Sequence, residues 1–369
     1  MSTLKSIRWQ RLRYYPKTRL YPTVPFDKEK DKPLRHPTPD EVSKACELAD
    51  RKFFLMNFGR VVLVDPNDED SVIAIMEFTP WDQLTETDKE NLNFISTFLH
   101  QSKEFVNPVG SSTRSWGGKM WGIGWRKSQD FMQKFGRYIK AFPPSKMEKF
   151  DKLFQQSKLL GEILGDYYRG LSSGAFEHSQ ALMEHFNLPA FDSLSFGEKP
   201  SPNSCSPHLT FTTDNFFNPP HKDHNDISKW AFVMFIPIYS ATGKLAGPES
   251  GYDIKGGPFV FPSFHTGISF DKQHGIVKMV WQANKYRHCT LPSFSPSGSK
   301  EFSCLGLSLQ ITTSIVNAVR KEAKGHYKDP LHYFGDHFYY MFRCLAKGTL
   351  LAALFCFHYF LFIISLFFK

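Results

Sequence analysis

The chain has 369 residues, 16% of them aromatic and 22% charged, with a formal net charge of +9 at pH 7. This length allows one large or two modest domains with a sizeable core, 37 Phe residues exclude a low-complexity disordered chain, and the positive charge favours an anionic partner, either nucleic acid or an acidic membrane surface. Six scattered Cys residues without a C-x-x-C pair exclude a zinc finger and a disulfide framework, and they favour a reducing compartment.

The N-terminal residues are basic, aromatic and interrupted by proline. They contain no apolar run, which excludes a secretory signal, and we expect residues 1–37 to form a flexible arm. A helix should begin after Thr38, because Thr38 and Glu41 form a capping box and Pro39 takes the first helical position.

A β-hairpin and three helices are predicted in the next part of the chain. The hairpin consists of two β-rich runs, 60–65 and 71–78, which are joined by the turn signal PNDED. Helical periodicity then runs over residues 85–104, 144–170 and 174–186.

Two further segments of this region are not periodic or allow more than one interpretation. Residues 107–127 are rich in Gly and Trp without a regular period, which predicts a structured loop packed on the core. Residues 125–142 interleave basic and aromatic side chains, which suits phosphate contacts combined with base stacking. An ordinary amphipathic helix with a solvated cationic face explains the same pattern equally well.

After residue 187 the chain changes to short apolar runs separated by Pro, Gly and Asp. A series of strands that follows a helical region predicts an α+β chain whose second half closes as a sandwich or jelly roll. A last helix should span 313–324. The predicted strands are 209–213, 231–239, 259–262, 267–270, 276–281 and 305–312.

The C-terminal end has a different composition. Residues 348–368 contain no charge and are long enough to cross a bilayer as a helix, and Arg343, Lys347 and Lys369 flank them. We expect a membrane anchor there, with 326–347 as an aromatic linker and the rest of the chain in the cytosol. The alternative is a translated non-native end, in which case we expect a nuclear protein.

The densest group of metal-binding residue types is the sequence HKDHND, which contains two His-x-Asp pairs, His221/Asp223 and His224/Asp226. In an extended backbone, residues i and i+2 point to the same side, so either pair can present an imidazole and a carboxylate to one point. A polar turn before a strand explains the pairs equally well, because a chain with fourteen His should contain about one such pair by chance. A non-haem Fe(II) site needs a second imidazole, which His288 can supply from a later strand.

Five segments carry a resemblance to a known family. In chain order they are GGKMWGIGWRK, PPHKD, GGPFVFP, GIVKMVWQANKYRHCTLPS and LGLSLQ. Together they resemble the Tet-like family of 2-oxoglutarate- and Fe(II)-dependent oxygenases, relatives of the Tet and J-binding-protein enzymes that oxidise 5-methylpyrimidines in DNA. The resemblance covers roughly residues 50–325.

The resemblance implies both a fold and a site. The fold is a double-stranded β-helix, that is, a jelly roll. The domain would span 38–325, with helical support at about 85–186 and the jelly-roll core at about 205–312. His221, Asp223 and His288 would hold Fe(II), 2-oxoglutarate would be the co-substrate, and the substrate would be a methylated base in nucleic acid.

The chain departs from the family at the co-substrate site. The family holds 2-oxoglutarate with an Arg on the last barrel strand, but this chain has Cys304 at that position. Lys300 is the nearest cation, and it would act with help from Ser303 or Ser308. A lysine is a point charge and does not reproduce the planar fork of a guanidinium.

Three hypotheses for the function therefore stand side by side. The first is a dioxygenase that hydroxylates a methylated base. The second is a membrane-tethered dioxygenase acting on a protein or a small molecule, which the apolar C-terminal segment favours. The third is a pseudoenzyme of the same fold that binds nucleic acid or a protein without turnover, which Cys304 favours.

Overall fold

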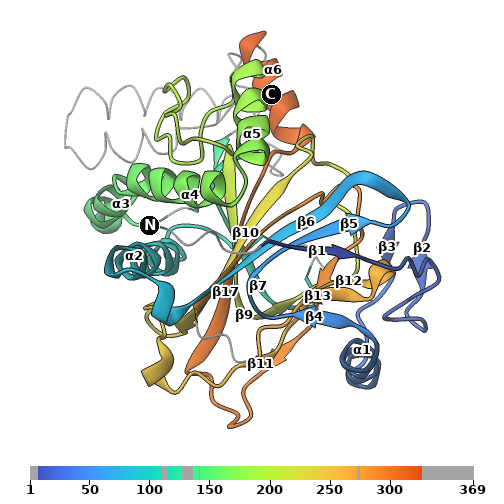
Figure 1. Ribbon diagram of the computed structural model, residues 1–369. Coiled ribbons are helices and arrows are strands. Elements are labelled where there is room, and N and C mark those ends of the chain that lie inside the picture. The colour runs from blue at the N-terminus through green and yellow to red at the C-terminus, as the bar shows by residue number, and fades with distance from the viewer. Residues whose placement is uncertain (1–6, 110–114, 127–135, 141, 272–274, 326–369) are drawn as a thin grey trace, which may run out of the picture.

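The computed structural model describes residues 7–109, 115–126, 136–140, 142–271 and 275–325. In these ranges the chain has a mixed α and β fold, in which a nine-stranded sheet packs against a four-stranded sheet on one face and against helices on the other (Figure 1). This architecture agrees with the mixed helix and strand content expected from the sequence and is compatible with a jelly roll.

The nine-stranded sheet carries most of the core, and β10 (Ala231–Tyr239) is its central strand. Phe232 and Met234 of β10 pack with the helices, whereas Val233 and Phe235 pack with the smaller sheet. This burial on both faces explains why the run is apolar throughout. The other strands, in sheet order around β10, are β1 (Ile7–Arg11), β5 (Arg60–Asp65), β6 (Asp68–Pro80) and β14 (Gly275–Trp281) on one side, and β17 (Phe302–Gln310), β9 (His208–Phe217), β7 (Gly117–Arg126) and β8 (Gly136–Arg137) on the other.

The smaller sheet closes the second side of the core. Its residues Phe259, Phe261 and Ile268 share a buried cluster with Val233, Phe235 and other residues of the large sheet. The strands of the smaller sheet, in order, are β15 (Cys289–Thr290), β12 (Phe259–Phe261), β13 (Thr266–Ile268) and β4 (Phe54–Met56). Two short strand pairs lie outside both sheets: β2 (Phe26–Asp27) with β3 (Lys32–Pro33), and β11 (Lys255–Gly256) with β16 (Ser293–Phe294).

Helices support the large sheet from the side away from the smaller one. The helices α2, α3 and α4 lie together on this side in Figure 1, and their apolar faces form one buried cluster with β10 and β17. The helix bounds are α1 (Pro39–Lys52), α2 (Glu86–Ser102), α3 (Met147–Phe154), α4 (Ser157–Leu171), α5 (Ser173–His185) and α6 (Thr313–Ala323), with 3₁₀ turns at Trp81–Gln83, Pro144–Lys146, Pro248–Ser250 and Pro262–Phe264.

Several predicted elements agree with these bounds. Thr38 and Glu41 form the predicted capping box at the start of α1. The predicted hairpin corresponds to β5 and β6, which pair antiparallel. The strand predicted at 231–239 corresponds to β10, and the helix predicted at 313–324 corresponds to α6.

Three expectations from the sequence are wrong. Residues 7–37 do not form an arm: β1 joins the large sheet parallel to β5, and Leu20 and Tyr21 are buried against α1 and the smaller sheet. The segment expected as a loop contains β7, and its strand character was hidden by the glycines at 122 and 124. The single helix predicted over 144–170 is two helices, because the chain turns at Gln155 and Ser157 bonds to the carbonyl oxygens of Phe154 and Asp192.

The segment 125–142 is not an amphipathic helix in the part that the structure describes. Trp125 and Arg126 end β7, and Arg137 lies in β8 opposite Trp125. The remaining residues of the basic and aromatic pattern, 127–135 and 141, lie outside the described ranges.

The predicted linker 326–347 and the predicted anchor 348–368 both lie outside the described residues. Among the helices that are described, none is long and apolar enough to span a membrane.

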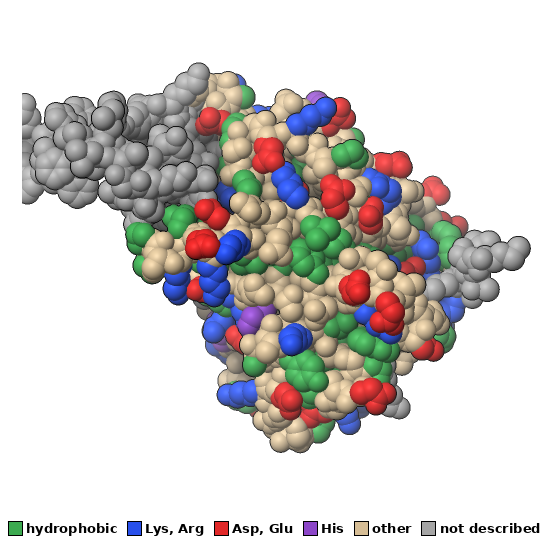
Figure 2. Space-filling model, turned by 90° about the vertical axis from the view of Figure 1, so that its left-hand side faces the viewer, with side chains coloured by type: hydrophobic (Ala, Val, Ile, Leu, Met, Phe, Trp, Pro, Cys, Tyr) green, Lys and Arg blue, Asp and Glu red, His purple; other side chains and the backbone are tan. Residues whose placement is uncertain are grey.

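The face seen in Figure 2 carries basic and acidic side chains side by side. The helices of this side show the same mixture, since Glu104 pairs with Lys146 and Lys149, and Glu148 pairs with Lys152. Paired charges of both signs attract a polyanion less than a surface of one sign does. The described helices on this face therefore present charges of both signs.

Candidate metal centre

Backbone pairing brings His221 and His288 together, although they are far apart in the sequence. The two residues form an isolated antiparallel bridge, in which each N–H donates to the other's carbonyl oxygen at 3.0 and 2.9 Å. Asp223 is fixed by its own N–H, which donates to the carbonyl oxygen of Ala283 at 3.0 Å. Three separate backbone contacts thus set the positions of the three side chains.

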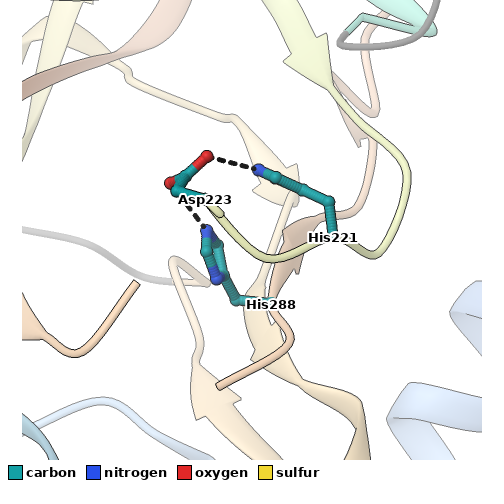
Figure 3. Close-up of side chains that lie close together, drawn as sticks. All are labelled: His221, Asp223 and His288. Atoms are coloured by element: carbon teal, nitrogen blue, oxygen red, sulfur yellow. Dashed lines mark ion pairs between the residues drawn. The ribbon is translucent and has the colours of Figure 1, made fainter. Parts of the chain in front are cut away.

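The three side chains point toward one another (Figure 3). The Nε2 atom of His221 lies 3.5 Å from one carboxylate oxygen of Asp223, and the Nε2 atom of His288 lies 3.6 Å from the other. One ligand atom from each residue falls within 4.8 Å of the others. A metal ion placed among them would contact two nitrogens and one oxygen.

The second nitrogen of each imidazole is held by a backbone carbonyl. The Nδ1 atom of His221 lies 2.8 Å from the oxygen of Pro219, and that of His288 lies 3.0 Å from the oxygen of Tyr286. A carbonyl only accepts hydrogen bonds, so Nδ1 carries the proton in both neutral rings. Each Nε2 atom is then free of a proton and presents its lone pair to the site.

Burial and charge set the ionisation of the site. The side chain of His288 is 4% exposed and stacks on Phe259 with 5.4 Å between ring centroids. Burial lowers the pKa of His288, and the neighbouring His221 lowers it further. Burial acts to raise the pKa of Asp223, but the contacts with the two imidazoles outweigh it and hold that pKa well below its ordinary value. Two neutral imidazoles and one carboxylate are the donor set of a non-haem Fe(II) site, so these residues fit the metal.

The second His-x-Asp pair has different surroundings. The Nε2 atom of His224 lies 2.8 Å from a carboxylate oxygen of Asp31, and both ends of this contact lie toward the surface. Asp31 also accepts a hydrogen bond from Arg287. His224 therefore ties the N-terminal segment to the loop, and it is not part of the group of ligand atoms.

A cavity of about 520 Å³ opens on the three residues. One of its walls is formed by β7, β9 and β17, and we call the cavity-facing residues of these strands the sheet wall. Gly306 keeps part of this wall open, because an added Cβ atom would lie 2.9 Å from Oγ1 of Thr212. The sheet wall comprises Met120, Arg126, His208, Thr210, Thr212, Cys304, Gly306, Ser308 and Gln310.

Of the residues considered for the co-substrate site, the structure places some at the cavity and others away from it. Ser308 and Cys304 lie on the sheet wall. Ser303 is buried and, as a neighbour of Cys304 on the same strand, points to the opposite face. Lys300 is exposed in the loop before β17. Neither Ser303 nor Lys300 is among the described residues that line the cavity.

Cys304 cannot supply the positive charge that the resemblance implies at its position. Burial raises the pKa of its thiol to about 12, while contact with Tyr252 acts in the opposite direction. The thiol is therefore neutral at physiological pH.

Sequence reasoning missed the contribution of β7 to the cavity. Arg126 lines it, and so does Tyr138, whose ring packs over Gly122. Met120 lines the cavity, and an added Cβ at Gly122 would meet Tyr138 of the same lining. Gly124 has a positive φ, and an added Cβ there would meet Phe191 of the helix-side core, so the strand alternation breaks before Arg126. The two glycines also remove the side chains that normally reveal a strand period.

One comparison with known proteins gives a family. The model of the Tet-like 2OG-Fe(II) oxygenase superfamily matches residues 85–293, more than half of the chain. The match includes His221, Asp223 and His288, and it confirms the resemblance expected from the sequence. A search of curated proteins finds no match.

Proposed function

Because the chain belongs to the Tet-like 2OG-Fe(II) oxygenase superfamily, we propose that it is a 2-oxoglutarate- and Fe(II)-dependent dioxygenase that oxidises a methylated nucleobase in DNA or RNA. The observation that carries the proposal is the convergence of His221, Asp223 and His288 at a cavity of about 520 Å³. A cavity of this volume is within the range of small-molecule sites.

Fe(II) would be held by His221, Asp223 and His288. Together with 2-oxoglutarate it supplies the oxidising chemistry that inserts an oxygen atom into a C–H bond. The protein contributes a fixed donor set: the carbonyl oxygens of Pro219 and Tyr286 hold the Nδ1 protons, which keeps both Nε2 atoms directed at the metal. The carboxylate of Asp223 offsets part of the metal's charge in a partly enclosed site.

The fold that suits this function is a double-stranded β-helix. Strands β9, β17, β10 and β14 would form its larger sheet, and β15, β12 and β13 its smaller one. The metal residues then lie where the two sheets approach each other, since the bridge between His221 and His288 is next to β15. This arrangement supports the assignment of the jelly-roll core.

The cavity lining suits a base that has left its helix stack. Such a base needs aromatic faces for stacking and polar groups for its hydrogen-bonding edge. Tyr138 and Phe216 offer aromatic rings, and Asn215 and Asn225 add polar groups to the same cavity. The net charge of +9 favours contact with the phosphates of a nucleic acid.

A second candidate function rests on Cys304. A neutral thiol at the family's arginine position favours a protein that keeps the fold and the metal but does not bind 2-oxoglutarate. Such a pseudoenzyme would bind its partner without turnover.

The first experiment uses the full chain loaded anaerobically with Fe(II). We expect 2-oxoglutarate to produce a saturable charge-transfer band, and we expect His221→Ala and His288→Ala to abolish it. His224→Ala is the matched control, because His224 belongs to the same motif but bonds to Asp31. Iron binding without the band would favour the pseudoenzyme.

The substrate is tested separately. The loaded enzyme is given oligonucleotides that contain 5-methylcytosine, beside unmethylated ones, and the bases are analysed by mass spectrometry after exposure to oxygen. An oxidised methyl group that depends on His221 supports the proposal. A band without oxidation of any methylated DNA or RNA would contradict the substrate class while leaving the dioxygenase class intact.

A further inference from the structure

The charges that line the cavity are few. Among the described lining residues, Asp223 is the only carboxylate and Arg126 is the only lysine or arginine. Asp223 is already engaged by the two imidazoles. Among the described lining residues, the only guanidinium or ammonium group that an anion in the cavity meets therefore belongs to β7.

Strand register places Arg126 near the metal end of the sheet wall. His208 pairs with Gly124 on one side and with Gln310 on the other. Arg126 follows Gly124 by two residues, and its side chain lines the cavity. Beyond Gln310, Thr312 forms a bridge with Asp226, which is three residues from Asp223. The end of β7 and the metal loop thus meet at the same edge of the sheet.

The guanidinium of Arg126 is positioned by an aromatic ring. Its Cζ atom lies 4.9 Å from the centroid of the Tyr138 ring, and this stacking orients the planar group. Within the described ranges, no carboxylate lies within ion-pair distance of Arg126. An oriented guanidinium without a carboxylate partner suits the two oxygens of a carboxylate ligand.

The position that the family uses for this purpose offers no cation. Cys304 and Ser308, which lie on the same sheet wall, are neutral, and Lys300 is outside the cavity lining. 2-Oxoglutarate carries two carboxylates, of which one lies away from the metal when the other end of the molecule binds it. Binding that second carboxylate in a partly enclosed cavity requires a positive partner.

We propose that Arg126 binds the carboxylate of 2-oxoglutarate that lies away from the metal, in place of the arginine that the family carries at the position of Cys304. The proposal rests on the proposed function, because it takes 2-oxoglutarate as the co-substrate. The hydroxyl groups of Thr210 and Ser308 lie on the wall between Arg126 and β10, where they add polar contacts for the same ligand.

The test compares two ligands that differ only in the second carboxylate. The full chain is loaded anaerobically with Fe(II), and the charge-transfer band is titrated with 2-oxoglutarate and with 2-oxobutyrate, in which a hydrogen atom replaces that carboxylate. We expect Arg126→Gln to lower the affinity for 2-oxoglutarate by about 10-fold to 100-fold, which is the range of a hydrogen-bonded ion pair. The affinity for 2-oxobutyrate should stay within about 2-fold of the wild-type value. Arg126→Lys should recover part of the loss, because it keeps the charge but not the fork.

The matched control is Arg320→Gln. Arg320 stacks on Phe186 with its Cζ atom 4.8 Å from the ring centroid, but it lies on the exposed face of α6, away from the cavity. Arg320→Gln removes the same charge and the same kind of stacking, and we expect it to leave the affinity for both ligands unchanged. The thermal midpoint of each variant, measured without ligand, shows whether the fold is retained.

The outcomes separate this inference from the proposed function. If the wild-type protein gave no band with 2-oxoglutarate, both the proposed function and the role of Arg126 would be contradicted. A normal band combined with unchanged selectivity in Arg126→Gln would overturn the role of Arg126 and leave the dioxygenase standing. Equal weakening of both ligands would overturn it too, because the arginine would then act on the metal centre. The role of Arg126 would also be overturned if Lys300→Gln abolished 2-oxoglutarate binding and Arg126→Gln did not.

Discussion

The metal centre and the sheet wall face the same cavity but depend on the chain in different ways. At the metal centre, Asp223 is fixed between two imidazoles, and three backbone hydrogen bonds, two of them shared by His221 and His288, set the three positions. On the sheet wall, the cation lies on β7, and the strand that carries Cys304 contributes only neutral groups. Three ligands of one metal must keep their mutual geometry, whereas a single positive charge serves from any strand that lines the cavity.

The largest expected effect tests the fixed side of this comparison. Asp223→Asn keeps the shape of the side chain but replaces a carboxylate oxygen with a neutral amide. We expect Fe(II) affinity to fall by more than about 100-fold, since even loss of a group behind a metal ligand costs about 10-fold to 100-fold. Anaerobic iron titration measures the effect.

The control for this substitution is Asp31→Asn, which alters the surface contact of His224 and should leave iron binding unchanged. Retention of tight iron binding by Asp223→Asn would show that the metal does not use this carboxylate. The metal centre would then be as replaceable as the sheet wall.

A second buried carboxylate shows what Asp223 would do without its imidazoles. Asp192 is buried, and its Oδ1 atom has no hydrogen-bond partner in the described part of the chain. Burial raises the pKa of Asp192 to about 6 from the ordinary 3.8, the reverse of the shift at Asp223. The unfolded chain therefore releases its proton at lower pH than the folded chain, and the free energy of unfolding falls as pH rises from 3.8 to about 6.

Asp192→Asn should remove the loss of stability that comes from ionising this buried carboxyl group. We expect the variant to be more stable than the wild type at pH 8, by up to about 3 kcal/mol, and to lose the advantage at about pH 3, where both states mostly hold the proton. Urea unfolding at the two pH values measures it, with Asp82→Asn as an exposed control. An equal effect at both pH values would show that the gain does not come from ionisation.

A cation placed on the neutral part of the sheet wall tests whether its position is free. In the Arg126→Gln background, Cys304→Arg returns a guanidinium to the position used by the family. Because residue 304 faces the cavity, we expect the double variant to bind 2-oxoglutarate about 10-fold more tightly than Arg126→Gln alone. The charge-transfer band provides the affinity.

The double variant carries an unpaired buried charge when no ligand is bound. Its thermal midpoint should therefore rise steeply as the concentration of 2-oxoglutarate increases. Cys304→Ser in the same background is the control, because it stays neutral. No recovery in the arginine variant would mean that the two positions on the wall are not equivalent, and that the co-substrate reaches only one of them.

The same distinction explains what could be predicted from the sequence. His221 and Asp223 are two residues apart, so local geometry can pair them, but it can pair His224 and Asp226 as well, and the resemblance selected the first pair. The apolar runs around them predict β10 and β14 with nearly correct bounds. His288 was predicted as the second imidazole because it follows a later predicted strand, and the resemblance implied the same residue. The bridge that brings it to His221 depends on long-range pairing, which local patterns do not predict.

The sheet wall was harder to predict because its signals are weak or indirect. Glycines interrupt the alternation of β7, so Arg126 was assigned to a loop or a helix and not to the cavity. Lys300 was chosen because it is the cation nearest to Cys304 in the sequence. Which side chains face a cavity depends on the face of the strand from which they project, and not on sequence distance. Residues 1–37 were predicted to form an arm because they are basic, aromatic and interrupted by proline. The partner of β1 lies about fifty residues away, so no local pattern indicates that pairing.

The smallest expected effect concerns the space on the sheet wall. In Gly306→Ala, the added Cβ atom lies 2.9 Å from Oγ1 of Thr212 and 3.4 Å from the Phe235 ring, so the threonine must move. We expect a loss of about 1 kcal/mol in stability from overpacking. We also expect a less than 10-fold loss of 2-oxoglutarate affinity, about 1.4 kcal/mol or less, with iron binding unchanged.

Gly170→Ala is the matched control, because an added Cβ atom there meets nothing within 4 Å and alanine favours the helix α4. It should raise stability by up to about 1 kcal/mol and leave both ligands unaffected. If Gly306→Ala instead lowered iron affinity, strain on the wall would be reaching the metal centre. The two sides of the cavity would then be mechanically coupled, and the freedom to move the cation from β17 to β7 would need compensating changes at the metal.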